Sequence, residues 1–284
     1  MACSSENCGN IVVFCDNSNM SAIVDAFTRA RQHKKAALIG FMTAGFPYPD
    51  STPAMLRAMS DSGADVVEVG VPFSDPMADG PAIQRSSEVA LQNGMTLSKS
   101  LAAVAAYGAS EGAPAVMMGY ANSFMNHPGG VGGFASAAAG AGVKGIIVVD
   151  LADDERPQWR EALNNQQVEL INLIAPTTPA ERLKQLAMES QGFVYAISLK
   201  GVTGAAQSDI GSTREYLAAA RKHAEVPVAA GFGVRTPEHA AEFAEFADGV
   251  VVGSRLVEAV ESSKGDAETA VGDAVKELAG ALVI

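Results

Sequence analysis

Short apolar runs rich in β-branched residues recur along the chain, and segments with apolar residues at i, i+3 and i+4 spacing lie between them. Runs of this kind are typical of strands buried on both faces, and the spacing of the intervening segments is helical. The expected strands are residues 37–42, 65–69, 115–118, 145–149, 168–174, 193–197, 226–230 and 249–252. The expected helices between them are residues 53–62, 97–109, 132–141, 154–164, 179–190, 213–223 and 237–247.

Eight such alternations in 284 residues predict a (β/α)8 TIM barrel with its helices on the outside. The apolar positions Ile23, Val24 and Phe27 predict an extra N-terminal helix before the first strand. An open doubly wound sheet is the structural alternative, but no GxGxxG motif follows the first strand, which disfavours a dinucleotide-binding version of it. We expect residues 20–284 to form a single barrel domain and residues 1–19 to be a flexible extension.

Three sequences place a possible cap residue before proline at the first helical position. They are Ser51-Thr52-Pro53, Thr178-Pro179 and Thr236-Pro237. Each predicts the start of a helix.

Composition and charge exclude several classes of function. The net charge of −12 argues against a nucleic-acid partner, since phosphate-binding surfaces on that scale are basic. No apolar stretch is long enough to cross a membrane, and the start lacks the pattern of a signal peptide, so we expect a cytoplasmic protein. The three cysteines, Cys3, Cys8 and Cys15, all precede the predicted barrel, and no HxH or HExxH motif occurs, so neither a disulfide framework nor a metal site is expected.

The segment ADVVEVGVPFSDPMADGP, residues 64–81, places one acid inside a predicted strand and two more in the loop that follows. The apolar surroundings of Glu68 should raise its pKa, which suits a general acid at neutral pH. A buried ion pair is the structural alternative for Glu68, and a simple turn is the alternative for Asp79. Asp75, before Pro76, is more typical of a loop-shaping residue than of a catalyst.

Glycines follow the last three predicted strands: Gly201 and Gly204, then Gly231 and Gly233, then Gly253 with Ser254, which runs into a helix expected to start near Arg255. Backbone N–H groups at such glycines and at a helix start can hold a phosphate, and TIM barrels often bind phosphate after strands seven and eight. Tyr195 lies within the sixth strand, where a buried tyrosine is more often structural than catalytic. No GxSxG motif occurs, which disfavours a hydrolase, and Lys144 and Lys200 offer only a weak basis for a Schiff-base aldolase.

The motif VEVGVPFSDPMADGPAIQ closely resembles the signature of the tryptophan synthase alpha chain family. The resemblance continues through FMTAGFPYPD, MMGYANSF, IIVVDLADDE, FVYAISLKGVTGA, AAGFGVRTPEHA and DGVVVGSRLVE, and covers the chain from about Met20 onward. It implies a lyase of tryptophan biosynthesis that cleaves indole-3-glycerol phosphate, by a retro-aldol reaction, to indole and glyceraldehyde 3-phosphate.

The resemblance also implies the roles of particular residues. Glu68 and Asp79 match the two catalytic carboxylates of the family, and no metal or organic cofactor is implied in this chain. The substrate-binding residues expected are Phe41, Tyr120, Tyr195, Thr203, Gly204, Phe232, Gly233, Gly253 and Ser254.

The family's alpha chain docks on a beta chain that uses pyridoxal phosphate, and the resemblance places residues 72–76 in that contact. It therefore implies an alpha2-beta2 heterotetramer. Two alternatives remain open on the sequence alone, namely a free-standing indole-3-glycerol-phosphate lyase and a non-catalytic sugar-phosphate-binding barrel. A different phosphate-dependent barrel enzyme is a third reading.

The sequence departs from the family pattern at three places. Leu199 stands where the family often has arginine, Phe46 stands where it often has an acid, and Val149-Asp150-Leu151-Ala152 replaces a Pro-Asp-Leu-Pro-like motif. Leu199 puts the anchoring of the loop after the sixth strand in doubt, although Lys200 could compensate. Phe46 means that an acid often found near the barrel mouth is absent.

Overall fold

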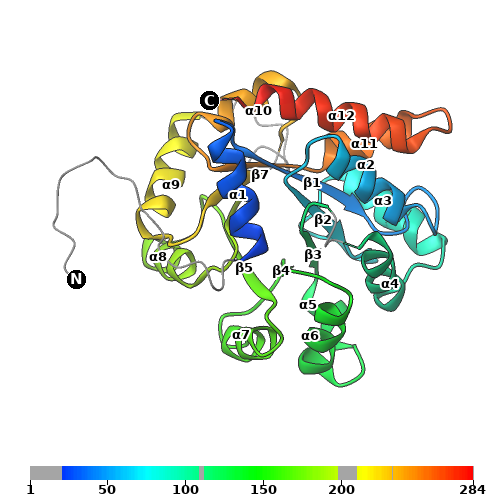
Figure 1. Ribbon diagram of the computed structural model, residues 1–284. Coiled ribbons are helices and arrows are strands. Elements are labelled where there is room, and N and C mark those ends of the chain that lie inside the picture. Colours follow the sequence, from blue (N-terminus) through cyan, green and yellow to red (C-terminus); the bar gives the residue numbers. More distant parts are fainter. Residues whose placement is uncertain (1–20, 109–111, 198–209, 232, 284) are drawn as a thin grey trace, which may run out of the picture.

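Eight parallel strands close into a barrel in the computed structural model of the chain (Figure 1), which describes residues 21–108, 112–197, 210–231 and 233–283. The strand order follows the sequence, and β1 closes the barrel by pairing with β8. The strands are β1 (Ala37–Thr43), β2 (Val66–Gly70), β3 (Ala115–Gly119), β4 (Gly145–Val148), β5 (Glu169–Ile174), β6 (Val194–Ile197), β7 (Val228–Gly231) and β8 (Gly249–Val252). The prediction of a (β/α)8 TIM barrel is confirmed.

Helices surround the barrel and cover the outward face of its strands. They are α1 (Ala22–Gln32), α2 (Thr52–Asp61), α3 (Pro81–Gln92), α4 (Leu97–Tyr107), α5 (Ala121–Met125), α6 (Gly130–Gly140), α7 (Arg156–Asn164), α8 (Ala180–Glu189), α9 (Ile210–His223), α10 (Pro237–Ala244), α11 (Ser254–Ser262) and α12 (Ala267–Ala281). No helix in the described part of the chain is long and apolar enough to cross a membrane.

The strands separate two apolar cores. One lies between the strands and the outer helices, and it includes the outward-facing Val67 and Val69 of β2. The other fills the inside of the barrel with residues such as Val66, Ile147 and Ile171. Because successive side chains of a strand point to opposite faces, Glu68 faces the inside together with Val66.

Helix α1 closes the N-terminal end of the barrel, and Figure 1 shows it, in blue, lying across the strands. Its buried residues Ile23 and Phe27 belong to the inner core. The hydroxyl of Ser21 caps α1 by accepting from the N–H of Val24 and also donates to Glu169 at the start of β5, at 2.7 Å. With this end closed, the C-terminal ends of the strands are left to form a site.

The eight strands lie within two residues of their predicted bounds, whereas the helix predictions are less complete. The extra helix α1 is confirmed. Helices α3, α5 and α12 were not predicted as helices; α3 begins at Pro81, directly after a proline-rich loop whose pattern obscures it. The predicted extension, residues 1–19, lies outside the described residues.

The three predicted helix starts have different outcomes. Thr236 caps α10 by accepting from the N–H of His239, with Pro237 at the first position, as predicted. The prediction at Thr178 is wrong, because Pro179 itself is the cap residue and the Thr178 hydroxyl accepts from the N–H of Ala175. At α2 the helix begins as expected, but the hydroxyl of Ser51 donates backward to carbonyls of the preceding turn and caps nothing.

Candidate active site

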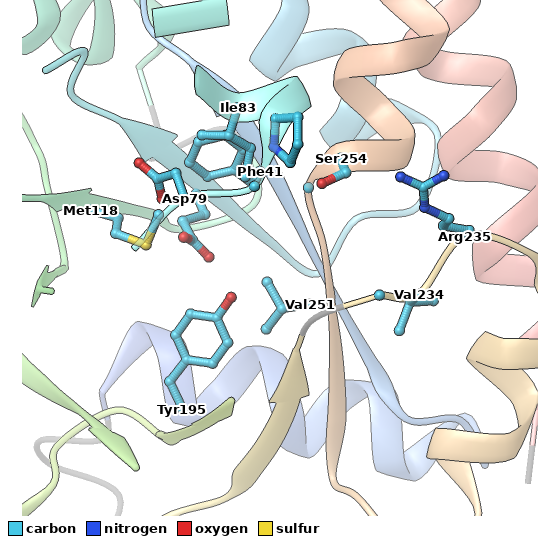
Figure 2. Close-up of a pocket in the computed structure, with 14 residues that line it drawn as sticks. Phe41, Asp79, Ile83, Met118, Tyr195, Val234, Arg235, Val251 and Ser254 are labelled. Atoms are coloured by element: carbon cyan, nitrogen blue, oxygen red, sulfur yellow. The ribbon is translucent and has the colours of Figure 1, made fainter. Parts of the chain in front are cut away.

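A cavity of about 210 Å³ lies at the C-terminal ends of the strands, on the side of the barrel opposite α1. Its wall combines two acids, two aromatic rings, several apolar side chains and a group of glycines. The lining residues are Phe41, Glu68, Asp79, Gly80, Pro81, Ile83, Met118, Tyr195, Gly233, Val234, Arg235, Val251, Gly253 and Ser254. Figure 2 shows Asp79 and Tyr195 facing each other across this space, with Ser254, Val234 and Arg235 together on the other side.

Glu68 is completely buried, although one side of its carboxyl group faces the cavity. Its neighbours in the barrel ladder are Phe41 on β1 and Val116 on β3. Neither carboxyl oxygen has a hydrogen-bond partner among the described residues. The alternative of a buried ion pair is therefore not seen in the described part of the chain.

Burial, together with repulsion from the like charge of the nearby Asp79, raises the pKa of Glu68 to about 8. The first cause is the larger one, because a carboxylate in an apolar interior loses its hydration. At neutral pH the group is therefore mostly protonated. A protonated carboxyl with an open side toward a cavity can give a proton to a bound molecule.

Asp79 lies in the loop between β2 and α3 and is held by Tyr120, which comes directly after β3. The Tyr120 hydroxyl donates to the Asp79 carboxylate at 3.3 Å and accepts from the N–H of Ala78 at 3.0 Å. The ring of Tyr120 also stacks on Phe73, with ring centres 4.8 Å apart, so the same residue contacts the loop at two places. Burial raises the pKa of Asp79 to about 6, and the hydrogen bond from Tyr120 limits the rise.

The two carboxyl groups thus have different charges near pH 7. Glu68, with the higher pKa, holds its proton, and Asp79, with the lower one, is mostly ionised. Two acids whose surroundings separate their pKa values in this way can divide the roles of proton donor and electrostatic stabiliser. The cavity therefore has the charges that acid–base chemistry at neutral pH needs.

The aromatic walls depend on two glycines at strand ends. A Cβ atom at Gly70 would overlap the ring of Phe41, and one at Gly231 would overlap the ring of Tyr195. Both rings are almost completely buried, at 3% and 5% exposure. The two glycines leave the room that these rings occupy next to the neighbouring strands, where both rings line the cavity.

The opposite end of the cavity is suited to an anion. Gly253 precedes α11, and Ser254 is its first residue, so the helix directs its N-terminal N–H groups and the positive end of its dipole toward this end. Gly233 adopts a left-handed backbone conformation, φ 78°, in the loop after β7, which exposes backbone groups that a larger residue would cover. A phosphate group fits this combination.

The structure places the predicted site residues as follows. It brings together Phe41, Glu68, Asp79, Tyr195, Gly233, Gly253 and Ser254 around one cavity. Tyr120 does not line the cavity, and its hydroxyl instead donates a hydrogen bond to Asp79. Thr203, Gly204 and Phe232, as well as Leu199 and Lys200, lie outside the described residues.

Several lining residues were missed by sequence reasoning. Met118 and Val251 face inward by strand alternation, which is a signal the sequence does contain. Pro81 and Ile83 belong to the unpredicted helix α3, and Val234 and Arg235 follow the predicted glycine loop directly. Phe46, which replaces an acid frequent in the family, is 4% exposed and packs into the outer core, so it adds no charge to the cavity.

The burial of Glu68 predicts that Glu68→Gln stabilises the protein. The folded chain keeps this proton up to pH about 8, while an unfolded chain loses it near the ordinary glutamate pKa of 4.5, so stability falls as pH rises between these values. Glutamine stays neutral in both states, and at pH 7 the variant should be more stable by about 3 kcal/mol. Urea unfolding at pH 4 and pH 7 measures this, with the exposed Glu215→Gln on α9 as the control. An equal stability of variant and parent at pH 7 would show that Glu68 is not held protonated.

Three comparisons with known proteins agree with the geometry. Residues 27–282 match the family described as "Tryptophan synthase alpha chain". A tryptophan synthase alpha chain of Laribacter hongkongensis is 44% identical over 245 residues, covering 86% of this chain and 92% of the relative. One of Burkholderia ambifaria is 43% identical over 265 residues, covering 93% and 97%.

Solved structures show the same likeness. A tryptophan synthase structure from Mycobacterium tuberculosis, in an aminoacrylate- and BRD0059-bound form, has a chain that matches with a TM-score of 0.84 at 36% identity, covering 94% of this chain and 100% of that one. The tryptophan synthase subunit alpha of Legionella pneumophila matches with a TM-score of 0.84 at 33% identity, covering 93% and 99%. Identity above 40% along most of the chain, together with this fold, shows that the chain belongs to the tryptophan synthase alpha chain family.

Proposed function

We propose that this cavity cleaves indole-3-glycerol phosphate to indole and glyceraldehyde 3-phosphate, with Glu68 as the proton carrier and Asp79 as the stabiliser of the positive charge on the ring. The activity is that of the family, a lyase of tryptophan biosynthesis. The observation that supports these roles most directly is the complete burial of Glu68 without a partner among the described residues, at the wall of the cavity.

The reaction needs two proton movements, and Glu68 can make both. Protonated Glu68 gives its proton to C3 of the indole, which turns the ring into a better leaving group. The resulting carboxylate then takes the proton of the glycerol hydroxyl next to the ring as the carbon–carbon bond breaks. That carbon becomes the aldehyde, the bonding electrons return to the indole ring, and Glu68 regains its proton.

Asp79 acts on the charge that develops between these two steps. Protonation at C3 makes the indole ring positive, and the ring N–H can donate to the ionised carboxylate of Asp79. Tyr120 holds Asp79 through its hydroxyl and the Ala78 N–H, so it is a positioning residue in this proposal and not a wall of the cavity. Phe41 and Tyr195 supply the flat apolar walls for the ring.

Phosphate binding at the far end orients the substrate. Gly233, Gly253 and Ser254 line the cavity, and Figure 2 shows Ser254 apart from Asp79, so in this proposal they contribute binding and orientation and not chemistry. The alpha chain of this family carries no cofactor, and pyridoxal phosphate belongs to the beta chain. Both carboxyl groups and the anion end share one cavity, which favours the lyase over a non-catalytic sugar-phosphate-binding barrel.

Glu68→Gln should lower the rate of indole release from indole-3-glycerol phosphate by about 10²-fold to 10⁴-fold, because glutamine cannot carry a proton. For the parent, kcat/KM should be highest between the pKa values of about 6 for Asp79 and about 8 for Glu68, falling on the acid side as Asp79 is protonated and on the alkaline side as Glu68 ionises. Glu169→Gln, which changes a half-buried glutamate at the closed end of the barrel, is the control and should retain activity. Near-full activity of Glu68→Gln would refute the assigned role.

We propose that the chain works in an alpha2-beta2 heterotetramer with a tryptophan synthase beta chain, the partner that the family implies. The segments that follow the neighbouring strands β1, β2 and β3 each expose one large apolar side chain, which supports a contact with a partner at this end of the barrel. Tyr48 after β1 is 61% exposed, Met77 after β2 is 81% exposed and Met125 after β3 is 44% exposed. Residues 72–76, expected at this contact from the resemblance, lie in the same loop as Met77.

Mixing the chain with a beta chain should give a complex whose mass corresponds to two alpha chains of 29.2 kDa and two beta chains, as measured by light scattering. Met77→Glu should weaken the complex, because it places a charge in an apolar contact. Met188→Glu on α8, where the parent side chain is 54% exposed, is the matched control and should leave the complex intact. A complex of one alpha and one beta chain would refute the stoichiometry, and equal effects of the two variants would refute the surface.

We also propose that residues 20–284 form one domain that works in the cytoplasm. A barrel closed through β1 and β8 uses strands from both ends of this range, so it has no natural point of division. The absence of cysteine after residue 15 in the sequence fits a compartment where disulfides do not form.

A further inference from the structure

Arg235 is the one cationic side chain among the described residues that line the cavity. It follows Gly233 and Val234 in the loop after β7, and Figure 2 shows it on the same side of the cavity as Ser254. The whole chain has a net charge of −12, and the cavity itself holds an ionised Asp79. A phosphate dianion that enters this cavity therefore meets a negative surrounding in which a local positive charge has a clear effect.

The guanidinium group of Arg235 has a partner on α11 that can be exchanged. It donates to Glu258 at 3.1 Å, and Glu258 lies one helical turn after Ser254. The Arg235 side chain is 60% exposed and that of Glu258 is 33% exposed. An ion pair this open to water is weak. A bound phosphate dianion carries two negative charges and the Glu258 carboxylate carries one, so the phosphate can compete for the guanidinium group.

We propose that Arg235 is a further phosphate-binding residue of this site, held at the edge of the cavity by Glu258 and shared with the phosphate group when the substrate binds. This inference rests on the proposed function, because it deepens the assignment of the anion end of the cavity. Arginine suits the task through its planar set of donors, which can face two oxygens at once. The backbone N–H groups at the start of α11 and at Gly233 bind the phosphate, and Arg235 adds the countercharge.

Arg235→Gln should raise KM for indole-3-glycerol phosphate by about 3-fold to 10-fold, as expected for the loss of one charge-assisted hydrogen bond near the surface. The kcat value should change little, because the phosphate contact is made equally in the ground state and the transition state. Glu258→Gln should act in the opposite direction and lower KM, since it frees the guanidinium group. The KM of the parent should also rise with salt concentration more steeply than that of Arg235→Gln.

Arg85→Gln is the matched control. Arg85 also pairs with a glutamate of α11, at 2.8 Å to Glu261, and is 53% exposed, but it does not line the cavity. The KM of Arg85→Gln should stay at the parent value. A KM unchanged in Arg235→Gln, or raised equally in Arg85→Gln, would overturn the inference. So would an equal KM increase for indole-3-glycerol, the substrate analogue that lacks the phosphate group.

A calorimetric titration of the full chain with inorganic phosphate separates this inference from the proposed function. Phosphate should bind the parent and Arg85→Gln alike and bind Arg235→Gln several-fold more weakly. Equal binding by all three proteins would overturn the role of Arg235 even if the parent releases indole. If the parent released no indole while Arg235→Gln bound phosphate more weakly, the lyase assignment would fail and the phosphate-binding role of Arg235 would remain supported.

Discussion

The carboxyl group of Glu68 lies inside a barrel whose neighbouring inward-facing side chains are mostly apolar, and the function of the site depends on that burial. A surface glutamate would be ionised at neutral pH and could not give a proton to a carbon atom. Inside the barrel, with no partner among the described residues, the neutral form is favoured and the pKa rises to about 8. The strand fixes where this acid points, since alternation along β2 sends Glu68 inward together with Val66.

The same burial opposes folding, and the rest of the barrel offsets its cost. Two apolar cores, one inside the strands and one beneath the helices, surround the strand that carries Glu68. Asp79 needs a different environment, so it lies in a loop where Tyr120 can donate to it and keep its pKa lower. The separation of the two pKa values thus follows from one acid being in a strand and the other in a loop.

The sequence predicts the structure correctly where a pattern of apolar and polar residues is compatible with only one arrangement. Eight apolar runs separated by helical segments close into a barrel, and an acid inside one run has to be buried, so the strands and Glu68 could be placed from the sequence. The glycines after the last three strands indicated a phosphate site by their position, whereas the role expected of Tyr120 came only from the family motif. The structure changed the reading of Tyr120, since its hydroxyl contacts Asp79 and its ring stacks on Phe73 outside the cavity wall.

The sequence could not predict the contacts that depend on packing between distant elements. The start of α3 at Pro81 was hidden by a loop rich in proline, and with it the cavity contacts of Pro81 and Ile83. The pair between Arg235 and Glu258 joins a loop to a helix 23 positions away, and no local pattern marks it. Likewise, the need for glycine at position 231 follows from the ring of Tyr195 on the neighbouring strand. That contact is visible only when β6 and β7 are paired in the structure.

A direct titration of Glu68 tests the central claim. Carbon-13 labelling of glutamate carboxyl groups, with the Glu68 signal identified by its loss in Glu68→Gln, gives the protonation state of this group by NMR across the pH range. The account predicts a midpoint at pH about 8, with the group mostly neutral at pH 7. A midpoint near the ordinary glutamate pKa of 4.5 would mean that Glu68 is ionised at neutral pH and would contradict its role as the proton donor.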